Sequence, residues 1–100
     1  MGAEELAERR RRAEAARAER LRIERFRTVY RAIDARHPLS AITAHVLLAE
    51  LAGVQGQLSS RPKALYRAAA ARWHPDLENG DEEVFKLLQE VYRVVRPVSA

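Results

Sequence analysis

The four prolines of this chain mark the boundaries of its helical segments, and they constrain the fold more than any other feature. Proline lacks a backbone N–H and pushes the preceding residue out of the α region. Pro38, Pro75 and Pro97 each follow a repeat of apolar residues with helical period, so we expect each to end a helix. Pro62 stands where the first turn of a helix tolerates it. No segment alternates with period two, so the sequence predicts an all-α fold.

Capping residues and apolar repeats predict four helices, at 3–36, 41–52, 61–73 and 82–96. Ser40, Ser60 and Asp81 are expected to cap the last three, because their side chains accept hydrogen bonds from the free N–H groups of a first turn. Gly53 is expected to close the second helix. A linker is predicted at 54–59. The implied organisation is a charged helical arm, a small helical domain and a short tail, at 1–37, 40–96 and 97–100.

The first predicted helix has two unlike halves. Up to residue 20 it contains mainly Ala, Glu and Arg, which form helices well but offer almost nothing to bury. We expect this half to be mobile or loosely helical in solvent. Beyond it, apolar residues recur at helical spacing. This stripe is expected either to pack on the helical domain or to pair with another helix as a coiled coil: Ile23, Phe26, Tyr30 and Ile33.

The last two predicted helices are joined by a short loop, which forces them into an antiparallel pair. The third is expected to bury Pro62, Tyr66, Ala69 and Trp73. The fourth is expected to bury Phe85, Leu88, Tyr92 and Val95. The loop between them contains His74-Pro75-Asp76, followed by an Asn-Gly turn.

A basic stripe leads along the third helix into this loop. At 3.6 residues per turn, Lys63, Arg67 and His74 fall within about 40° of one another, on a side distinct from the buried stripe. Arg72 lies away from that stripe and is a weaker candidate for the same surface. Taken alone, a His-Pro-Asp tripeptide is also compatible with a loop that merely ends a helix, and each basic residue with a solvated face.

Three stretches of the sequence together resemble the J domain, the domain of DnaJ-like co-chaperones. Residues 63–76, KALYRAAAARWHPD, resemble the second helix and signature loop of that family. Residues 85–95, FKLLQEVYRVV, are similar to its third helix, and LAGV at 51–54 resembles the turn after its first helix. The resemblance covers about residues 46–95, and the order of these stretches makes it more specific than the tripeptide alone.

The resemblance implies an antiparallel helical hairpin steadied by a short preceding helix, here with a long charged N-terminal helix added. It implies a co-chaperone that stimulates ATP hydrolysis by a DnaK-type (heat-shock seventy) chaperone, with no catalytic residue and no cofactor of its own. By the same resemblance, His74, Pro75 and Asp76 meet the nucleotide-binding domain and linker region of the partner, and Lys63 and Arg67 meet its acidic surface.

The alternative function is a scaffold or binding module whose basic N-terminal helix contacts nucleic acid, the ribosome or an acidic protein. Residues 1–36 hold eleven Arg against six Glu and one Asp, an excess of +4, while the rest of the chain is balanced. The candidate contacts are Arg9, Arg10, Arg11 and Arg12. Interspersed glutamates favour a solvated helix over nucleic-acid binding. A client or assembly partner could instead bind through the N-terminal helix.

Several classes of function are not expected. The chain has no cysteine, and its three histidines lack metal-ligand spacing, so no metal site is predicted. No nucleophile–base pair or glycine-rich phosphate loop indicates an enzyme. The longest apolar stretch is too short and too polar to span a bilayer, and the charged N-terminus is unlike a signal peptide. We therefore expect a cytoplasmic protein without a membrane contact.

Overall fold

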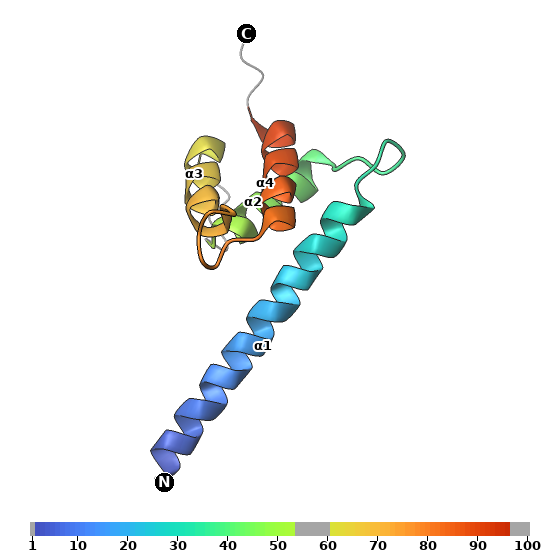
Figure 1. The fold of residues 1–100 in the computed structure, drawn as a ribbon. Coiled ribbons are helices and arrows are strands. Elements are labelled where there is room, and N and C mark those ends of the chain that lie inside the picture. The colour runs from blue at the N-terminus through green and yellow to red at the C-terminus, as the bar shows by residue number, and fades with distance from the viewer. Residues whose placement is uncertain (1, 54–60, 97–100) are drawn as a thin grey trace.

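The computed structural model describes residues 2–53 and 61–96, and these residues fold into helices without any strand. This confirms the predicted all-α fold. The order is α1 (Ala3–Ala32), α2 (Ala41–Ala52), α3 (Pro62–Trp73) and α4 (Glu82–Val95). Figure 1 shows α2, α3 and α4 gathered in one bundle, while α1 lies along it and then extends well beyond it. No helix among the described residues is long and apolar enough to cross a membrane.

The first helix ends earlier than the sequence predicted. Its last residue is Ala32 rather than residue 36, and Ile33 is already extended, with φ −74° and ψ 121°. Asp34 explains the difference, because its carboxylate accepts hydrogen bonds from the backbone N–H groups of Arg36 (2.8 Å) and His37 (2.7 Å). An aspartate that bonds the backbone two and three residues ahead stabilises a turn in competition with a helix.

The bounds predicted for α2 are confirmed. The Ser40 hydroxyl accepts a hydrogen bond from the Thr43 backbone N–H at 3.2 Å. At the other end, Gly53 adopts the left-handed conformation, with φ 79°, which favours a residue without a side chain. A Cβ atom there would also lie 3.0 Å from an Arg72 side-chain nitrogen. The two caps thus fix the length of the helix that precedes the hairpin.

The hairpin helices begin close to their predicted positions. Arg61 is the N-cap of α3 without a side-chain hydrogen bond, and Pro62 occupies the first turn. The predicted cap Ser60, the linker 54–59 and the tail 97–100 lie outside the described residues. Asp81 caps α4 as predicted, since its carboxylate accepts a hydrogen bond from the Val84 N–H at 3.0 Å.

The core lies between the three short helices and the second half of α1. The Trp73 indole N–H donates to the Leu51 carbonyl at 2.9 Å, which ties the end of α3 to the end of α2. Phe26 is completely buried, and its ring meets the Trp73 ring edge-on with centroids 5.8 Å apart. The apolar stripe of α1 therefore belongs to the core, although its other predicted members are only partly buried.

The predicted buried faces of the hairpin were partly wrong. Ala69, Trp73, Leu88 and Val95 are buried as expected. The remaining predicted positions, Pro62, Tyr66, Phe85 and Tyr92, are only half-buried. The fully buried places are taken instead by Leu65, Val84, Leu87 and Val91. The larger tyrosines lie at the rim, where Tyr66 and Tyr92 stack on each other with ring centroids 4.4 Å apart. There their hydroxyls can stay in water.

Candidate functional site

The His74-Pro75-Asp76 loop lies at one end of the antiparallel pair formed by α3 and α4 (Figure 1). Its backbone closes in a compact series of hydrogen bonds. The Leu77 N–H donates to the His74 carbonyl and the Gly80 N–H to the Leu77 carbonyl, both at 3.0 Å. The Asp81 N–H then donates to the Trp73 carbonyl at 3.1 Å, so the two helix ends are bonded directly.

Gly80 allows the loop to fold back on itself. A Cβ atom at this position would lie 1.8 Å from the His74 carbonyl oxygen, a separation that no side chain can accommodate. The Asn-Gly turn therefore requires glycine at its second position, because the glycine backbone packs directly against the first residue of the loop. Any substitution here would displace the His74 backbone.

The His74 side chain is held on two sides. Its ring lies edge-on to the Phe85 ring, with centroids 5.0 Å apart. Its Nδ1 accepts a hydrogen bond from the Asp76 backbone N–H at 3.2 Å and lies 3.6 Å from the Asp76 carboxylate. A neutral imidazole that accepts at Nδ1 carries its hydrogen on Nε2, so the ring can act as a donor. About half of the side chain, 46%, stays exposed.

Pro75 and Asp76 form the exposed tip of the loop. The Asp76 side chain is 92% exposed, so its carboxylate is available to a partner. Pro75 has a fixed φ and restricts the backbone between the two polar residues. The loop therefore presents a donor-capable ring and a carboxylate on a backbone with little freedom.

Lys63 and Arg67 are exposed on α3, and neither forms an ion pair within residues 2–53 and 61–96. Arg72 is placed differently, about 180° around the helix from Lys63. Its guanidinium pairs with Glu19 of α1 at 3.0 Å and lies 5.0 Å from the centre of the Trp73 ring. Arg72 thus joins the two helices, whereas the other two basic residues face solvent.

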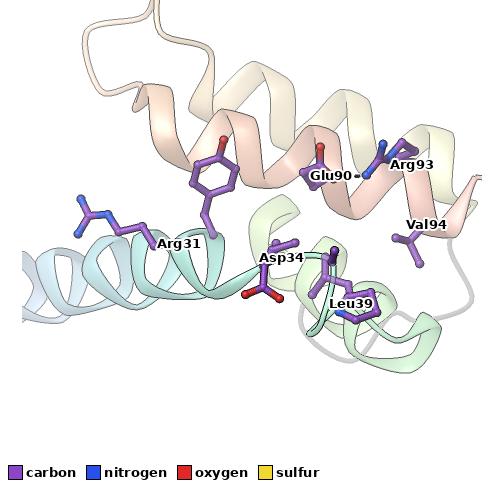
Figure 2. Close-up of a pocket in the computed structure, with 10 residues that line it drawn as sticks. Arg31, Asp34, Leu39, Glu90, Arg93 and Val94 are labelled. Carbon is purple, nitrogen blue, oxygen red and sulfur yellow. Dashed lines mark hydrogen bonds and ion pairs between the residues drawn. The ribbon is translucent and has the colours of Figure 1, made fainter.

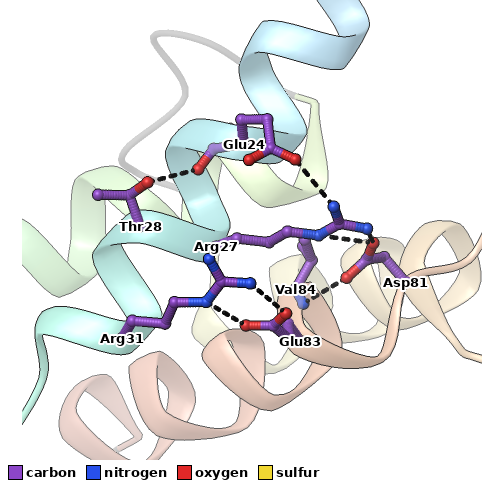
Figure 3. Close-up of polar contacts among 7 residues, drawn as sticks. All are labelled: Glu24, Arg27, Thr28, Arg31, Asp81, Glu83 and Val84. Atoms are coloured by element: carbon purple, nitrogen blue, oxygen red, sulfur yellow. Dashed lines mark hydrogen bonds and ion pairs between the residues drawn. The ribbon is translucent and has the colours of Figure 1, made fainter.

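Two arginines of α1 hold the start of α4, and Figure 3 shows both. Arg27 donates from Nε to the Asp81 carboxylate at 3.1 Å and makes a second, shorter contact from Nη2. Arg31 forms two hydrogen bonds with Glu83, at 2.9 and 2.7 Å. Sequence reasoning missed these contacts. The partners are separated by 54 and 52 residues, and no local spacing connects them.

These contacts lower the pKa of both carboxyl groups. Burial alone would raise the pKa of Asp81, but hydrogen bonds from Arg27 and from the Val84 N–H outweigh it, and the pKa lies below its usual value. The pKa of Glu83 is lowered chiefly by the hydrogen bonds from Arg31. The loop that contains His74 therefore ends at Asp81, a charged residue that both caps α4 and binds Arg27 of α1.

An open hollow of about 640 Å³ lies on another part of the surface, between the end of α1, the segment that follows it and α4 (Figure 2). Most of its charged lining residues form ion pairs with one another or with other described residues. Arg93 contacts Glu90 at 2.5 Å, and Arg31 contacts Glu83. The hollow does not include the His-Pro-Asp loop.

The arginines singled out in the arm do not form one patch. Because successive residues of an α-helix turn by about 100°, Arg9, Arg10, Arg11 and Arg12 point in four directions. Arg12 pairs with Glu8 at 2.6 Å, in the favoured acid-first order. Among the described residues, no group of three or more His, Asp or Glu side chains is arranged to hold a metal ion.

Comparisons of the chain with models of protein families, with curated protein sequences and with solved structures found no match in any of the three.

Proposed function

We propose that this protein is a J-domain co-chaperone that stimulates ATP hydrolysis by a DnaK-type chaperone. The observation that carries the proposal is the exposed His74-Pro75-Asp76 loop at the end of an antiparallel helical pair. The short preceding helix α2 packs on both members of this pair. This is the arrangement that the sequence resemblance implies.

Each residue of the loop has a role that its surroundings support. Asp76 can form a charge-assisted hydrogen bond with an arginine or lysine of the partner, because its carboxylate is almost fully exposed. The His74 ring can donate a hydrogen bond from Nε2 to the partner. Pro75 and the internal hydrogen bonds limit the motion of the loop, so docking would order few additional degrees of freedom.

Lys63 and Arg67 supply the electrostatic part of the proposed interface. Both are exposed, and both lie on the side of α3 that leads toward His74. Ala68 follows Arg67 and adds no charge, so the basic stripe depends on Lys63 and Arg67. Their charges would attract an acidic surface on the nucleotide-binding domain and accelerate encounter.

The position of α1 is compatible with this interface. It contacts α3 through the Glu19–Arg72 ion pair and through the rings of Phe26 and Trp73, and Arg72 lies on the side of α3 opposite Lys63. The long helix therefore leaves the proposed partner surface uncovered. A sequence without cysteine fits a reducing compartment, and we propose the cytoplasm as the location of this protein.

The test is a steady-state ATPase assay with a DnaK-type chaperone and increasing amounts of the full chain. Wild type should raise the turnover rate, whereas His74→Gln and Asp76→Asn should each abolish the increase. Glu78→Gln is the matched control, because it neutralises another exposed residue of the same loop. All variants should keep the wild-type circular dichroism spectrum. Full stimulation by both His74→Gln and Asp76→Asn would refute the proposal.

A further inference from the structure

The charges on the projecting half of α1 are divided between two sides of the helix. Viewed down a helix with 3.6 residues per turn, four glutamates lie within one sector of about 100°. These are Glu4, Glu5, Glu8 and Glu19. The buried side chain of Phe26 points into the same sector. Another sector of about 100° contains four arginines, which we call the arginine stripe: Arg9, Arg10, Arg17 and Arg20. Arg10 and Arg17 point about 160–180° away from Phe26.

The ion pairs follow the same division. Glu8 pairs with Arg12, and Glu19 pairs with both Arg22 and Arg72. Within residues 2–53 and 61–96, by contrast, no member of the arginine stripe forms an ion pair. Glu14 lies at the edge of the stripe and pairs with none of its members. Residues 3–20 are nearly balanced in charge, with six Arg against five Glu, yet on one side of this segment the guanidinium groups are exposed and form no ion pair among the described residues.

The length of the stripe fits an extended polyanion. From Arg9 to Arg20 it spans about 16 Å, over which one strand of B-DNA carries about five phosphates. Ala13 and Ala16 lie between the arginines and leave room for close approach to the helix. Each guanidinium can bind two phosphate oxygens at once, which an ammonium group does not do with the same geometry.

Other partners fit this side of the helix less well. A helix that lies on a membrane needs an apolar face, and residues 3–18 are exposed throughout with Leu6 as their largest apolar side chain. Residues 3–20 contain no aromatic side chain on which the bases of a single strand could stack. We propose that the arginine stripe binds the phosphate backbone of a duplex nucleic acid without reading its sequence.

The proposal can be tested by fluorescence anisotropy with the full chain and labelled 20-base-pair duplexes of mixed sequence, one of DNA and one of RNA. The test variant replaces Arg10, Arg17 and Arg20 by alanine. The matched control replaces Arg11, Arg12 and Arg22 by alanine, which removes the same charge from other sides of the same helix. Alanine is the best helix former, so both variants should keep their helix content by circular dichroism.

Wild type should bind at 50 mM salt, and the stripe variant should lose roughly tenfold or more in affinity. The slope of log affinity against log salt should fall by about 2 to 3, since about 0.9 is lost for each phosphate contact removed. The control should retain most of the affinity and the slope. Binding of either duplex with this pattern supports the proposal, and the stronger of the two identifies the nucleic acid.

Three results would overturn the proposal. One is no binding of either duplex by wild type at 50 mM salt. Another is equal losses in the stripe and control variants, which would mean that only net charge matters. The third is a preference for a protein partner, seen either as tighter binding of poly-glutamate than of duplex or as self-association that the stripe variant abolishes in sedimentation experiments. Either would assign the stripe to an acidic protein or to a second copy of this chain.

Discussion

The ring of His74 packs edge-on against the ring of Phe85, with 5.0 Å between centroids and 61° between planes. His74 belongs to the loop, whereas Phe85 lies in the first turn of α4, only half-buried. A half-buried aromatic side chain that packs against the edge of the core thus also supports a polar residue of the candidate site. The contact also links the orientation of the histidine to the start of the second hairpin helix.

Replacement of Phe85 by leucine should therefore affect the loop more than the fold. Leucine keeps an apolar side chain at the rim of the core but cannot offer a ring face or edge to His74. If the proposed function holds, stimulation of a DnaK-type ATPase should fall several-fold, while the urea midpoint changes little. Tyr92→Leu is the control, since it removes a half-buried aromatic residue of the same helix, far from the loop. Equal losses of stimulation in both variants would contradict this role for Phe85.

Asp81 performs two tasks that substitutions can separate. Its carboxylate caps α4 and also binds Arg27 of α1, and its side chain is only 11% exposed. Asp81→Asn keeps a good cap but loses the charge, and should lower the free energy of unfolding by about 1 kcal/mol. Asp81→Ala loses the cap as well and should cost about 2 kcal/mol. Chemical denaturation measures both. If the two variants are equally stable, the cap contributes nothing.

Acid should weaken the attachment of α1 to α4. The folded-state pKa values of Asp81 and Glu83 are lowered, so the stability that they contribute is complete above their unfolded pKa values of about 4. This contribution is lost as pH falls through the lower, folded-state values. Urea unfolding should therefore show a gap between wild type and the Asp81→Asn/Glu83→Gln double variant at pH 7. The gap should narrow steadily below about pH 4, and a constant gap down to pH 2 would exclude this linkage.

The second half of α1 should be essential to the fold, and the first half dispensable. Phe26 is completely buried against Trp73, so Phe26→Ala should cost about 3–5 kcal/mol. Leu21, one and a half turns earlier, is 65% exposed, and Leu21→Ala should cost almost nothing. Deletion of residues 1–18 should likewise leave the thermal midpoint nearly unchanged. A large loss on that deletion would show that the projecting half stabilises the bundle.

The features that local chemistry determines could be predicted from the sequence. Ser40 and Gly53 correctly indicated the two ends of α2, because an N-cap serine and a left-handed glycine depend only on residues a few positions away. Pro75 indicated the end of α3 for the same reason. The exposed loop followed, since a short connection between two amphipathic helices leaves its polar residues at the surface.

One local signal, the turn formed by Asp34, was missed, and the features that depend on distant contacts could not be predicted. The apolar repeat continues through Ile33, and only the turn formed by Asp34 ends the helix at Ala32. Several neighbouring apolar residues of α4 compete for its buried side, and the packing of α1, α2 and α3 around it decides among them. The Arg27–Asp81 contact connects residues 54 positions apart, so nothing in the local sequence of either residue indicates the other.

Arg67 should act on the rate of partner binding rather than on the fold. It is exposed, and no ion pair among the described residues uses its charge. Exposed charge pairs contribute on the order of 0.2–1 kcal/mol each. Arg67→Ala should therefore slow association with a DnaK-type chaperone only several-fold, and Arg67→Glu considerably more, because it adds repulsion. Arg36→Glu is the matched control, since it reverses another exposed charge, on the segment after α1.

The salt dependence of these rates provides the decisive comparison. Toward roughly 1 M salt the Debye length is about 3 Å, so long-range attraction between exposed charges is screened. Stopped-flow association rates of wild type and the Arg67 variants should therefore converge at high salt and differ at low salt, while Arg36→Glu follows wild type throughout. Helical content should be unchanged in Arg67→Ala, because alanine favours the helix. If Arg67→Glu associates like wild type at low salt, the basic side of α3 is a solvated surface, and recognition depends on the His74-Pro75-Asp76 loop alone.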